Sequence, residues 1–174
     1  ATAPERAVEP VRAIRTTARE ALTEIRRVLD VLRADDDLPN SGSPGVAAVA
    51  ALVESARSAG ASVAVTERLG DVPLPPEVDL AAYRIVQECL TNVLKHAPGA
   101  AVAIAIEQAA DRLVVRVTNS LPGSPAAGSE GSGYGISGMR ERAEALGGTL
   151  DAGAATGRFE VQAILPLPPQ EVER

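Results

Sequence analysis

The stretch Gln87-Glu88-Cys89-Leu90-Thr91-Asn92-Val93-Leu94-Lys95-His96 decides the fold, because it lies in the strongest predicted helix of the chain, residues 77–96. Pro75 and Pro76 precede that helix, and Pro98-Gly99 ends it, as is typical of helix boundaries. We expect its large apolar side chains to form the face that packs on the core: Leu80, Tyr83, Val86, Leu90, Val93 and Leu94.

The same helix carries a polar stripe. Glu88, Asn92 and His96 follow one another at intervals of four residues, and Lys95 lies three residues beyond Asn92, so the four share one face. The stripe offers a carboxylate that can act as a base, an amide oxygen that suits Mg²⁺, and two groups that can hold phosphate oxygens. An ordinary solvated helix face with polar residues four apart is the alternative interpretation.

A second motif runs from a glycine-rich loop into a predicted helix over residues 136–146, in Gly131-Ser132-Gly133-Tyr134-Gly135-Ile136-Ser137-Gly138-Met139. Bare backbone N–H groups at a helix start favour anion binding. The spacing of Gly133, Gly135 and Gly138 formally matches the dinucleotide fingerprint, but no strand directly precedes it and no doubly wound pattern surrounds it. A flexible surface loop is the alternative for this motif alone. The two motifs together predict a nucleotide-phosphate site.

Outward from these motifs, helices alternate with short β-rich runs. We expect helices over residues 46–59, 77–96 and 136–146, and strands over residues 62–69, 101–107, 112–118, 149–152 and 158–165. Residues 119–135 are expected to form a mobile, functional loop. This order predicts an α+β fold, a two-layer sandwich in which helices cover one face of a mixed sheet.

The N-terminal residues 4–33 predict a long helix with a heptad-like apolar seam, which requires a partner helix. We expect that partner in an oligomeric bundle; folding back on its own domain is the alternative. We therefore expect a helical segment at 1–34, a linker at 35–45, a main domain at 46–167 and a loose tail at 168–174. Because residue 1 falls in a helix-like segment, we expect the chain to be part of a longer one.

Composition excludes several classes of protein. The 174 residues carry 17 Lys and Arg against 23 Asp and Glu, a net charge of −6, with 2% aromatic residues and no Trp, so a nucleic-acid binder is not expected. One cysteine, Cys89, and one histidine, His96, exclude a disulfide framework and a two-histidine metal motif. The sequence has no signal-peptide pattern and no run of 18 apolar residues, so we expect no membrane contact and a reducing, cytoplasmic compartment.

Several segments together resemble a sensor histidine kinase. Arg84-Ile85-Val86-Gln87-Glu88 and residues 91–97 resemble its N box, and residues 133–142 with Leu146-Gly147-Gly148 resemble its later glycine box. The resemblance is to the nitrate- and lipid-sensor-type subfamily, because residues 19–33 resemble that subfamily's second dimerisation helix. It covers residues 4 to 167 and implies the fold shared by histidine kinases, gyrases and chaperone-type ATPases.

The resemblance implies a role for each matching position. Glu88 would be the base or water-orienting carboxylate, Asn92 would bind Mg²⁺, and Lys95 and His96 would approach the phosphates of ATP. Asn119 stands where the family has an adenine-reading Asp, and the Asp-x-Gly-x-Gly box is replaced here by Asn119-Ser120-Leu121-Pro122-Gly123. The nucleotide-binding residues implied by the resemblance are thus Asn92, Lys95, His96, Asn119, Gly123, Gly133, Gly135 and Gly138.

The expected function is that of the ATP-binding catalytic domain of a two-component kinase, with ATP and Mg²⁺ as cofactors. Its partners would be a response regulator and, in a full-length homodimer that could be membrane-anchored, a second copy. The acceptor histidine would lie on a helix absent from this chain, so we expect no self-phosphorylation. Two alternatives stay open: a dimerisation module that has lost ATP binding, and a serine kinase of the anti-sigma-factor type with the same fold.

Overall fold

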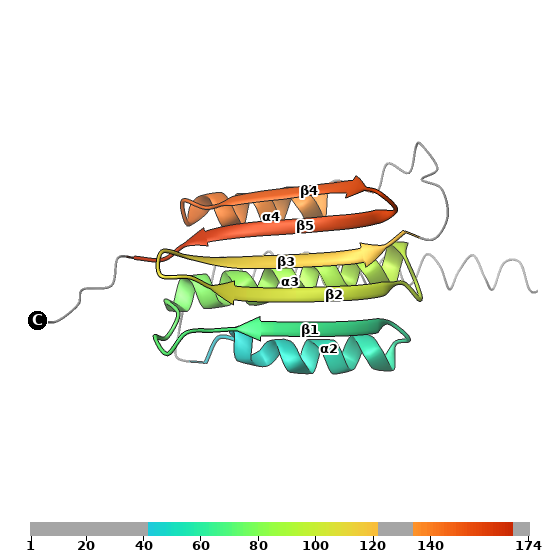
Figure 1. Ribbon diagram of the computed structural model, residues 1–174, viewed down its shortest axis with the longest axis horizontal. Coiled ribbons are helices and arrows are strands. Elements are labelled where there is room, and N and C mark those ends of the chain that lie inside the picture. Colours follow the sequence, from blue (N-terminus) through green and yellow to red (C-terminus); the bar gives the residue numbers. More distant parts are fainter. Residues whose placement is uncertain (1–41, 122–133, 169–174) are drawn as a thin grey trace, which may run out of the picture. The chain divides into compact units, whose positions relative to one another are not determined.

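The computed structural model describes residues 42–121 and 134–168 (Figure 1). In chain order the elements are η2 (Val46–Ala48), α2 (Val49–Ser58), β1 (Ser62–Arg68), α3 (Pro76–His96), β2 (Ala101–Gln108), β3 (Arg112–Ser120), α4 (Tyr134–Ala145), β4 (Thr149–Ala155) and β5 (Arg158–Pro166). These agree with the predicted helices and strands to within three residues at each end. The predicted N-terminal helix, most of the linker and most of the glycine-rich loop lie outside the described residues.

The five strands form one sheet in the order β1-β2-β3-β5-β4. β1 runs parallel to β2, and the other neighbouring pairs are antiparallel, which confirms the predicted mixed sheet. Side chains alternate between the two faces along a strand, so every second residue of β2 and β3 is buried: Val102, Ile104, Ile106, Leu113, Val115, Val117 and Asn119.

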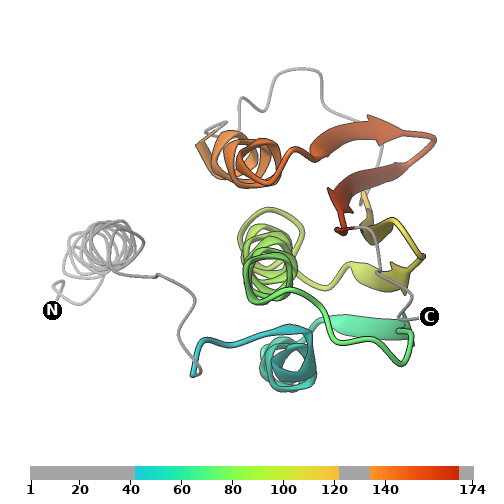
Figure 2. The ribbon, with the colours of Figure 1, turned by 90° about the vertical axis from the view of Figure 1, so that its left-hand side faces the viewer.

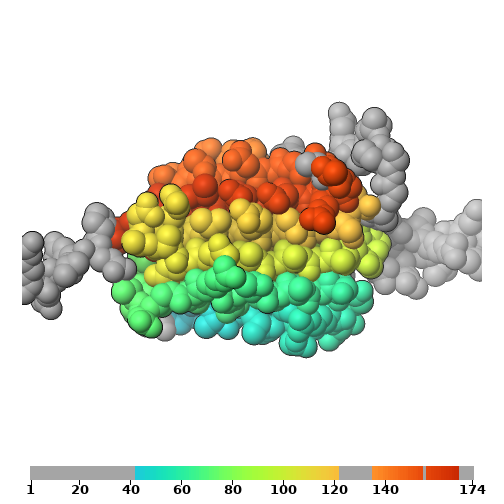
Figure 3. Space-filling view, viewed as in Figure 1, coloured from blue at the N-terminus to red at the C-terminus, as the bar shows by residue number. Residues whose placement is uncertain are grey.

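The helices lie on one side of the sheet only (Figure 2). Figure 3 shows the opposite face, where the strands run side by side without a covering layer. This face is exposed and rich in small or polar residues, as Ala64, Ala103, Arg116 and Glu160 illustrate. The predicted two-layer α+β sandwich is therefore confirmed.

The buried face of α3 differs from the predicted one. Its fully buried residues are Val78, Ala81, Ala82, Ile85, Val86, Cys89, Leu90 and Val93, whereas Leu80, Tyr83 and Leu94 are only half-buried. The reason is that α3 contacts α2 on one side, α4 on the other and the sheet beneath it. Helices that pack closely on several sides place small residues at the contacts.

Backbone turns hold the ends of these elements. Gly60, with φ of 97°, follows the C-cap residue of α2 and ends the helix. Thr156 and Gly157 have φ of 50° and 76° and form the two-residue turn between β4 and β5. The Leu121 N–H donates to the Gly157 carbonyl at 2.9 Å, which joins the end of β3 to this turn.

Candidate functional site

The polar stripe of α3 begins in its middle and ends at its last turn. Glu88 and Asn92 are half-buried, whereas Lys95 and His96 are exposed in the last turn of the helix. Along the helix, the stripe therefore passes from half-buried groups that can orient a ligand to exposed groups that can interact with the charge of the ligand.

α4 packs against α3, and Gly135 of α4 lies beside this stripe. A Cβ atom at Gly135 would collide with Glu88 Oε1 and would lie 3.3 Å from Asn92 Nδ2. The structure therefore brings together three of the predicted site residues, Glu88, Asn92 and Gly135, from segments that are more than 40 residues apart in the sequence.

Gly138 has a different environment, although it lies on the same helix and has been assigned the same role by resemblance. A Cβ atom there would meet no atom within 4 Å. Gly138 borders open space next to α4, whereas Gly135 is packed against side chains. Gly123 and Gly133 lie outside the described residues.

Asn119 is supplied by β3 and is 8% exposed. In the strand it alternates with Val115 and Val117, so its side chain lies on the helix-covered face of the sheet. Its Nδ2 donates to the Ser120 carbonyl at 3.1 Å. The alternation of the strand therefore turns this side chain away from solvent.

Sequence reasoning gave no role to two arginines next to Glu88. The pKa of the half-buried Arg142 guanidinium is lowered by burial and then by the positive charge of Arg84, while Glu88 acts in the opposite direction. Arg84 also donates from Nη1 to Gln87 Oε1 at 3.1 Å. The spacing of four residues from Arg84 to Glu88 was a signal in the sequence, but the approach of Arg142 depends on tertiary packing.

Cys89 occupies the buried side of α3 next to this site. Its Sγ lies 3.7 Å from Met139 Sδ of α4. Burial, assisted by the charge of Glu88, raises the pKa of the Cys89 thiol to about 12. The thiol is therefore protonated at neutral pH and serves packing between the two helices.

The polar groups of this site suit Mg²⁺ better than they suit a metal ion that is held by protein groups alone. In residues 42–121 and 134–168, no three His, Cys, Asp or Glu side chains cluster in a way that could hold a metal ion. Mg²⁺ keeps several waters and usually takes one or two protein oxygens together with the phosphates of a substrate. A single amide oxygen from Asn92 matches that pattern.

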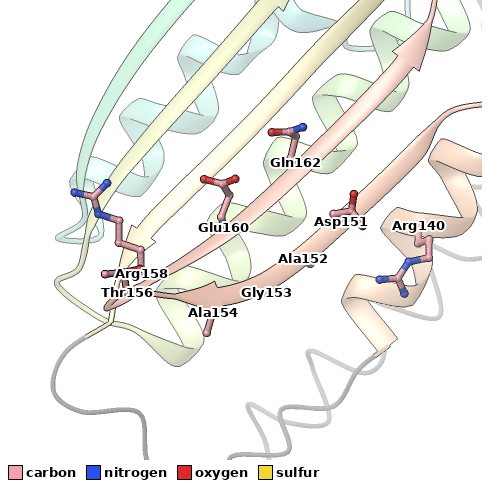
Figure 4. A pocket seen from close by; sticks show the side chains of 9 residues that line it. All are labelled: Arg140, Asp151, Ala152, Gly153, Ala154, Thr156, Arg158, Glu160 and Gln162. Carbon is pink, nitrogen blue, oxygen red and sulfur yellow. The ribbon is translucent and has the colours of Figure 1, made fainter.

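An open hollow of about 850 Å³ lies elsewhere, along β4 and β5 (Figure 4). It is lined by Arg140, Asp151, Ala152, Gly153, Ala154, Thr156, Arg158, Glu160 and Gln162. It contains none of the predicted site residues, and its charged side chains come from three elements: Arg140 from α4, Asp151 from β4, and Arg158 and Glu160 from β5. We therefore place the candidate site at α3 and α4 and not in this hollow.

Comparison with known proteins gives the family of this chain. Residues 77–169 match the family model described as histidine kinase-, DNA gyrase B-, and HSP90-like ATPase. The chain belongs to this ATPase family. The matched segment covers more than half of the chain and includes every predicted site residue. This confirms the predicted ATPase domain of the histidine-kinase type and its fold.

Relatives of this ATPase-family chain include named kinases. It is 32% identical over 155 residues to the sensor histidine kinase YxjM of Bacillus subtilis, covering 87% of this chain and 36% of that protein. It is 37% identical over 90 residues to the signal transduction histidine-protein kinase/phosphatase UhpB of Salmonella typhimurium, covering 52% and 18%. The chain thus spans about a third or less of the length of these relatives.

Among solved structures, the blue-light activated histidine kinase of Erythrobacter litoralis EL346 has the same fold. Its TM-score is 0.57 at 23% identity, with 71% of this chain and 42% of that chain covered.

In the described part of this chain, no helix combines the length and the apolar character needed to cross a membrane.

Proposed function

We propose that this chain is the ATP-binding catalytic part of a sensor histidine kinase of the nitrate- and lipid-sensor type. The observation that carries the proposal is the meeting of Glu88 and Asn92 with Gly135, in a chain of this ATPase family whose relatives are named sensor histidine kinases. The γ-phosphoryl group of ATP would pass to a histidine on another segment, and then to an aspartate of a response regulator.

The residues of α3 and α4 would act mainly by positioning and by charge neutralisation. Asn92 would bind Mg²⁺, which when bound shields the charges of the phosphates. Lys95 and His96, exposed at the end of α3, would approach the phosphate oxygens. Glu88 would orient the acceptor imidazole and take its proton as the nitrogen bonds to phosphorus and ADP leaves.

The inner face of the sheet and the glycines of α4 would complete the site. The Asn119 amide can accept a hydrogen bond from the adenine amino group and can donate one to a ring nitrogen. Gly138 borders open space beside α4, which leaves room for phosphates next to its backbone. Gly123, Gly133 and Gly135 would belong to the same phosphate-binding segment.

The organisation of the longer protein is part of this proposal. Residues 1–34 would be the second dimerisation helix, joined by a linker at 35–45 to the catalytic domain at 46–167. A homodimer would bring the acceptor histidine to this domain in the cytoplasm. The single histidine of this chain, His96, is the exposed last residue of α3 and belongs to the proposed phosphate-binding group.

A second candidate function is supported by one observation. Asn119 replaces the Asp expected for adenine recognition, and its Nδ2 already donates to the neighbouring Ser120 carbonyl. Because the Asn119 amide already has a hydrogen-bond partner on the neighbouring residue, it is less available to adenine. This would suit a dimerisation module that has lost ATP binding.

Calorimetry separates the two functions. We expect the chain to bind Mg-ATP more tightly than Mg-GTP, and to take up no acid-labile label from radioactive ATP. Gly138→Ala should fold normally yet bind Mg-ATP more weakly, because its methyl group would occupy the space next to α4. Absence of Mg-ATP binding would favour the dimerisation module. A stable phosphohistidine on this chain would contradict the assignment of the acceptor histidine to another segment.

A further inference from the structure

β4 forms one edge of the sheet and lies next to β5. Natural edge strands are usually protected from pairing with another chain by charged residues, proline or a bulge. The opposite edge strand, β1, carries the exposed Glu67 and Arg68, and Arg68 forms an ion pair with Glu107 at 3.4 Å. β4 has the sequence TLDAGAA, in which Asp151 is the single charged residue. The edge of β4 is therefore less protected than that of β1.

The hydrogen-bond pattern of the sheet determines which backbone groups of β4 face outward. In an antiparallel pair, hydrogen-bonded residue pairs alternate with pairs that are not hydrogen-bonded. The Leu121 N–H donates to the Gly157 carbonyl, so the odd-numbered residues of β5 bond to β3. The even-numbered residues of β5 then bond to the odd-numbered residues of β4. The backbone N–H and C=O groups of Leu150, Ala152 and Ala154 therefore face the free edge.

The start of this edge is already occupied by a side chain. Arg140 of α4 donates from Nε to the Leu150 carbonyl at 3.3 Å. At the other end, Thr156 has φ of 50° and turns the chain into β5. Ala152 and Ala154 lie between these points and line the open hollow of about 850 Å³ (Figure 4). The free part of the edge is therefore the short segment from Ala152 to Ala154.

Two charged side chains flank this segment, on the face of the sheet that the helices leave uncovered. Asp151 and Arg158 are exposed, and neither makes a hydrogen bond or an ion pair within residues 42–121 and 134–168. Asp151 pairs in register with Gln162, four residues beyond Arg158, which is about 13 Å along the strand. Figure 4 shows the two side chains at opposite ends of the hairpin. They are therefore available to a partner and too far apart to pair with each other.

A second copy of β4, paired antiparallel about a two-fold axis at Gly153, satisfies both the backbone groups and the charges. In this register Ala152 of each copy bonds to Ala154 of the other, so four outward backbone groups of each copy find partners. Asp151 lies opposite position 155 of the second copy, and the neighbour of position 155 on β5 is Arg158. Each Asp151 thus meets an Arg158 of the other copy, and the two-fold axis repeats this contact.

The neighbouring register is less favourable. If Ala152 paired with its own counterpart, Asp151 would lie opposite Gly153 of the second copy, whose neighbour on β5 is Glu160. Like charges in such positions are destabilising. That register would also require Leu150 to exchange its bond with Arg140 for a bond to the second copy. Charge and backbone pairing therefore select the register with Gly153 on the axis.

Gly153 itself has no evident conformational role within one copy. Its φ is not in the left-handed region, and a Cβ atom there would meet no atom within 4 Å. Glycine inside a strand weakens the strand and often marks a place where another backbone approaches closely. On the two-fold axis Gly153 would face its counterpart in a pair that is not hydrogen-bonded, with the Cα atoms about 4.5 Å apart.

We propose that the β4 edge is an interface between two copies of this chain, paired antiparallel about Gly153. The interface joins the two sheets edge to edge and forms the contact between Asp151 and Arg158 twice. This inference goes beyond the proposed function, because it requires neither a nucleotide nor the helix expected at residues 1–34.

Charge reversal tests the interface by sedimentation equilibrium of the full chain over a range of concentrations. Asp151→Arg and Arg158→Asp should each weaken self-association about 10-fold, because each places like charges opposite one another in two places. The variant that carries both changes should recover the wild-type association, because the pair is restored with its charges exchanged. Glu67→Arg is the matched control, since it reverses an exposed carboxylate on the opposite edge strand, and it should have no effect.

Disulfide trapping tests the position of the axis. In Gly153→Cys the two Cα atoms would lie within the range of about 4.4–6.8 Å that a disulfide requires. Under mild oxidation this variant should form a covalent dimer at least about 10 times as fast as Ala64→Cys, an exposed position on β1, because the interface raises the effective concentration of the thiols. The natural Cys89 is buried and should not contribute.

Three results would overturn the inference. The first is a double charge-exchange variant that associates no better than the single variants. The second is a Gly153→Cys chain that oxidises at the rate of Ala64→Cys, and either of these would leave the β4 edge to an extended segment of a different protein. The third is a loss of association in Glu67→Arg equal to that in Asp151→Arg, because association would then depend on net charge and not on this contact.

Discussion

Gly135 lies so close to Glu88 that a side chain at position 135 would collide with the Glu88 carboxylate. This relationship joins α4 to the polar stripe of α3. It also distinguishes two glycines of the same sequence motif, because a Cβ atom at Gly138 of the same helix would meet no atom within 4 Å.

Substitution of the two glycines by alanine should therefore have different effects on stability. Gly138→Ala should raise the free energy of unfolding by up to about 1 kcal/mol, because alanine favours the helix and has room. Gly135→Ala should gain less than Gly138→Ala, because its methyl group has to displace the ends of the Glu88 and Asn92 side chains. Urea unfolding of the nucleotide-free chain measures both, and equal effects would contradict the packing described at Gly135.

Asn92 and Glu88 should separate binding from transfer. Asn92→Ala should weaken nucleotide binding in the presence of Mg²⁺ and have little effect in its absence, because Asn92 offers an oxygen to the metal. Glu88→Gln should largely keep the affinity and lose about 10²–10⁴-fold in transfer rate, as expected for a lost base. Calorimetry with and without Mg²⁺ is the measurement, and a similar loss of affinity in both variants would refute these roles.

Asn119 should show opposite effects of an acidic substitution on stability and on binding. Asn119→Asp removes the hydrogen bond to the Ser120 carbonyl and places a carboxylate where the side chain is 8% exposed, so it should destabilise the free chain by about 1–3 kcal/mol. It should nevertheless tighten ATP binding by about 1 kcal/mol, since a charge-assisted hydrogen bond to adenine is stronger. Asn119→Ala should weaken binding, and unchanged affinity in both variants would place Asn119 outside the adenine pocket.

Cys89 should make the stability of the chain sensitive to alkaline pH. Its pKa is raised in the folded state from 9.0 to about 12, so its contribution is complete below pH 9 and is lost as the pH rises toward 12. A thiol reagent at pH 8 should label the chain only after unfolding, and this single cysteine makes the measurement unambiguous. The comparison is with Cys89→Ala, which should lose less stability between pH 9 and pH 11 than the wild type does.

Local periodicity was sufficient for much of the architecture. The helix that ends at His96 and its stripe of Glu88 and Asn92 follow from a repeat of 3.6 residues, which is a property of neighbouring positions. The strands expected at residues 101–107 and 112–118 correspond to β2 and β3, in which the structure shows every second residue buried. The ATPase family followed from motifs that are contiguous in the sequence, and the family match confirmed that ATPase family.

Only the tertiary structure decided how these segments meet. Periodicity could not show that Ala82 and Cys89 would be buried while Leu80 and Leu94 are only half-buried, because burial depends on the neighbours on each side of the helix. Periodicity also could not distinguish the surroundings of Gly135 from those of Gly138, because both are glycines of the same helix. The sequence by itself determined which chemical groups each helix carries. Packing between α3 and α4, whose nearest ends are 38 residues apart in the sequence, determined which of these groups touch.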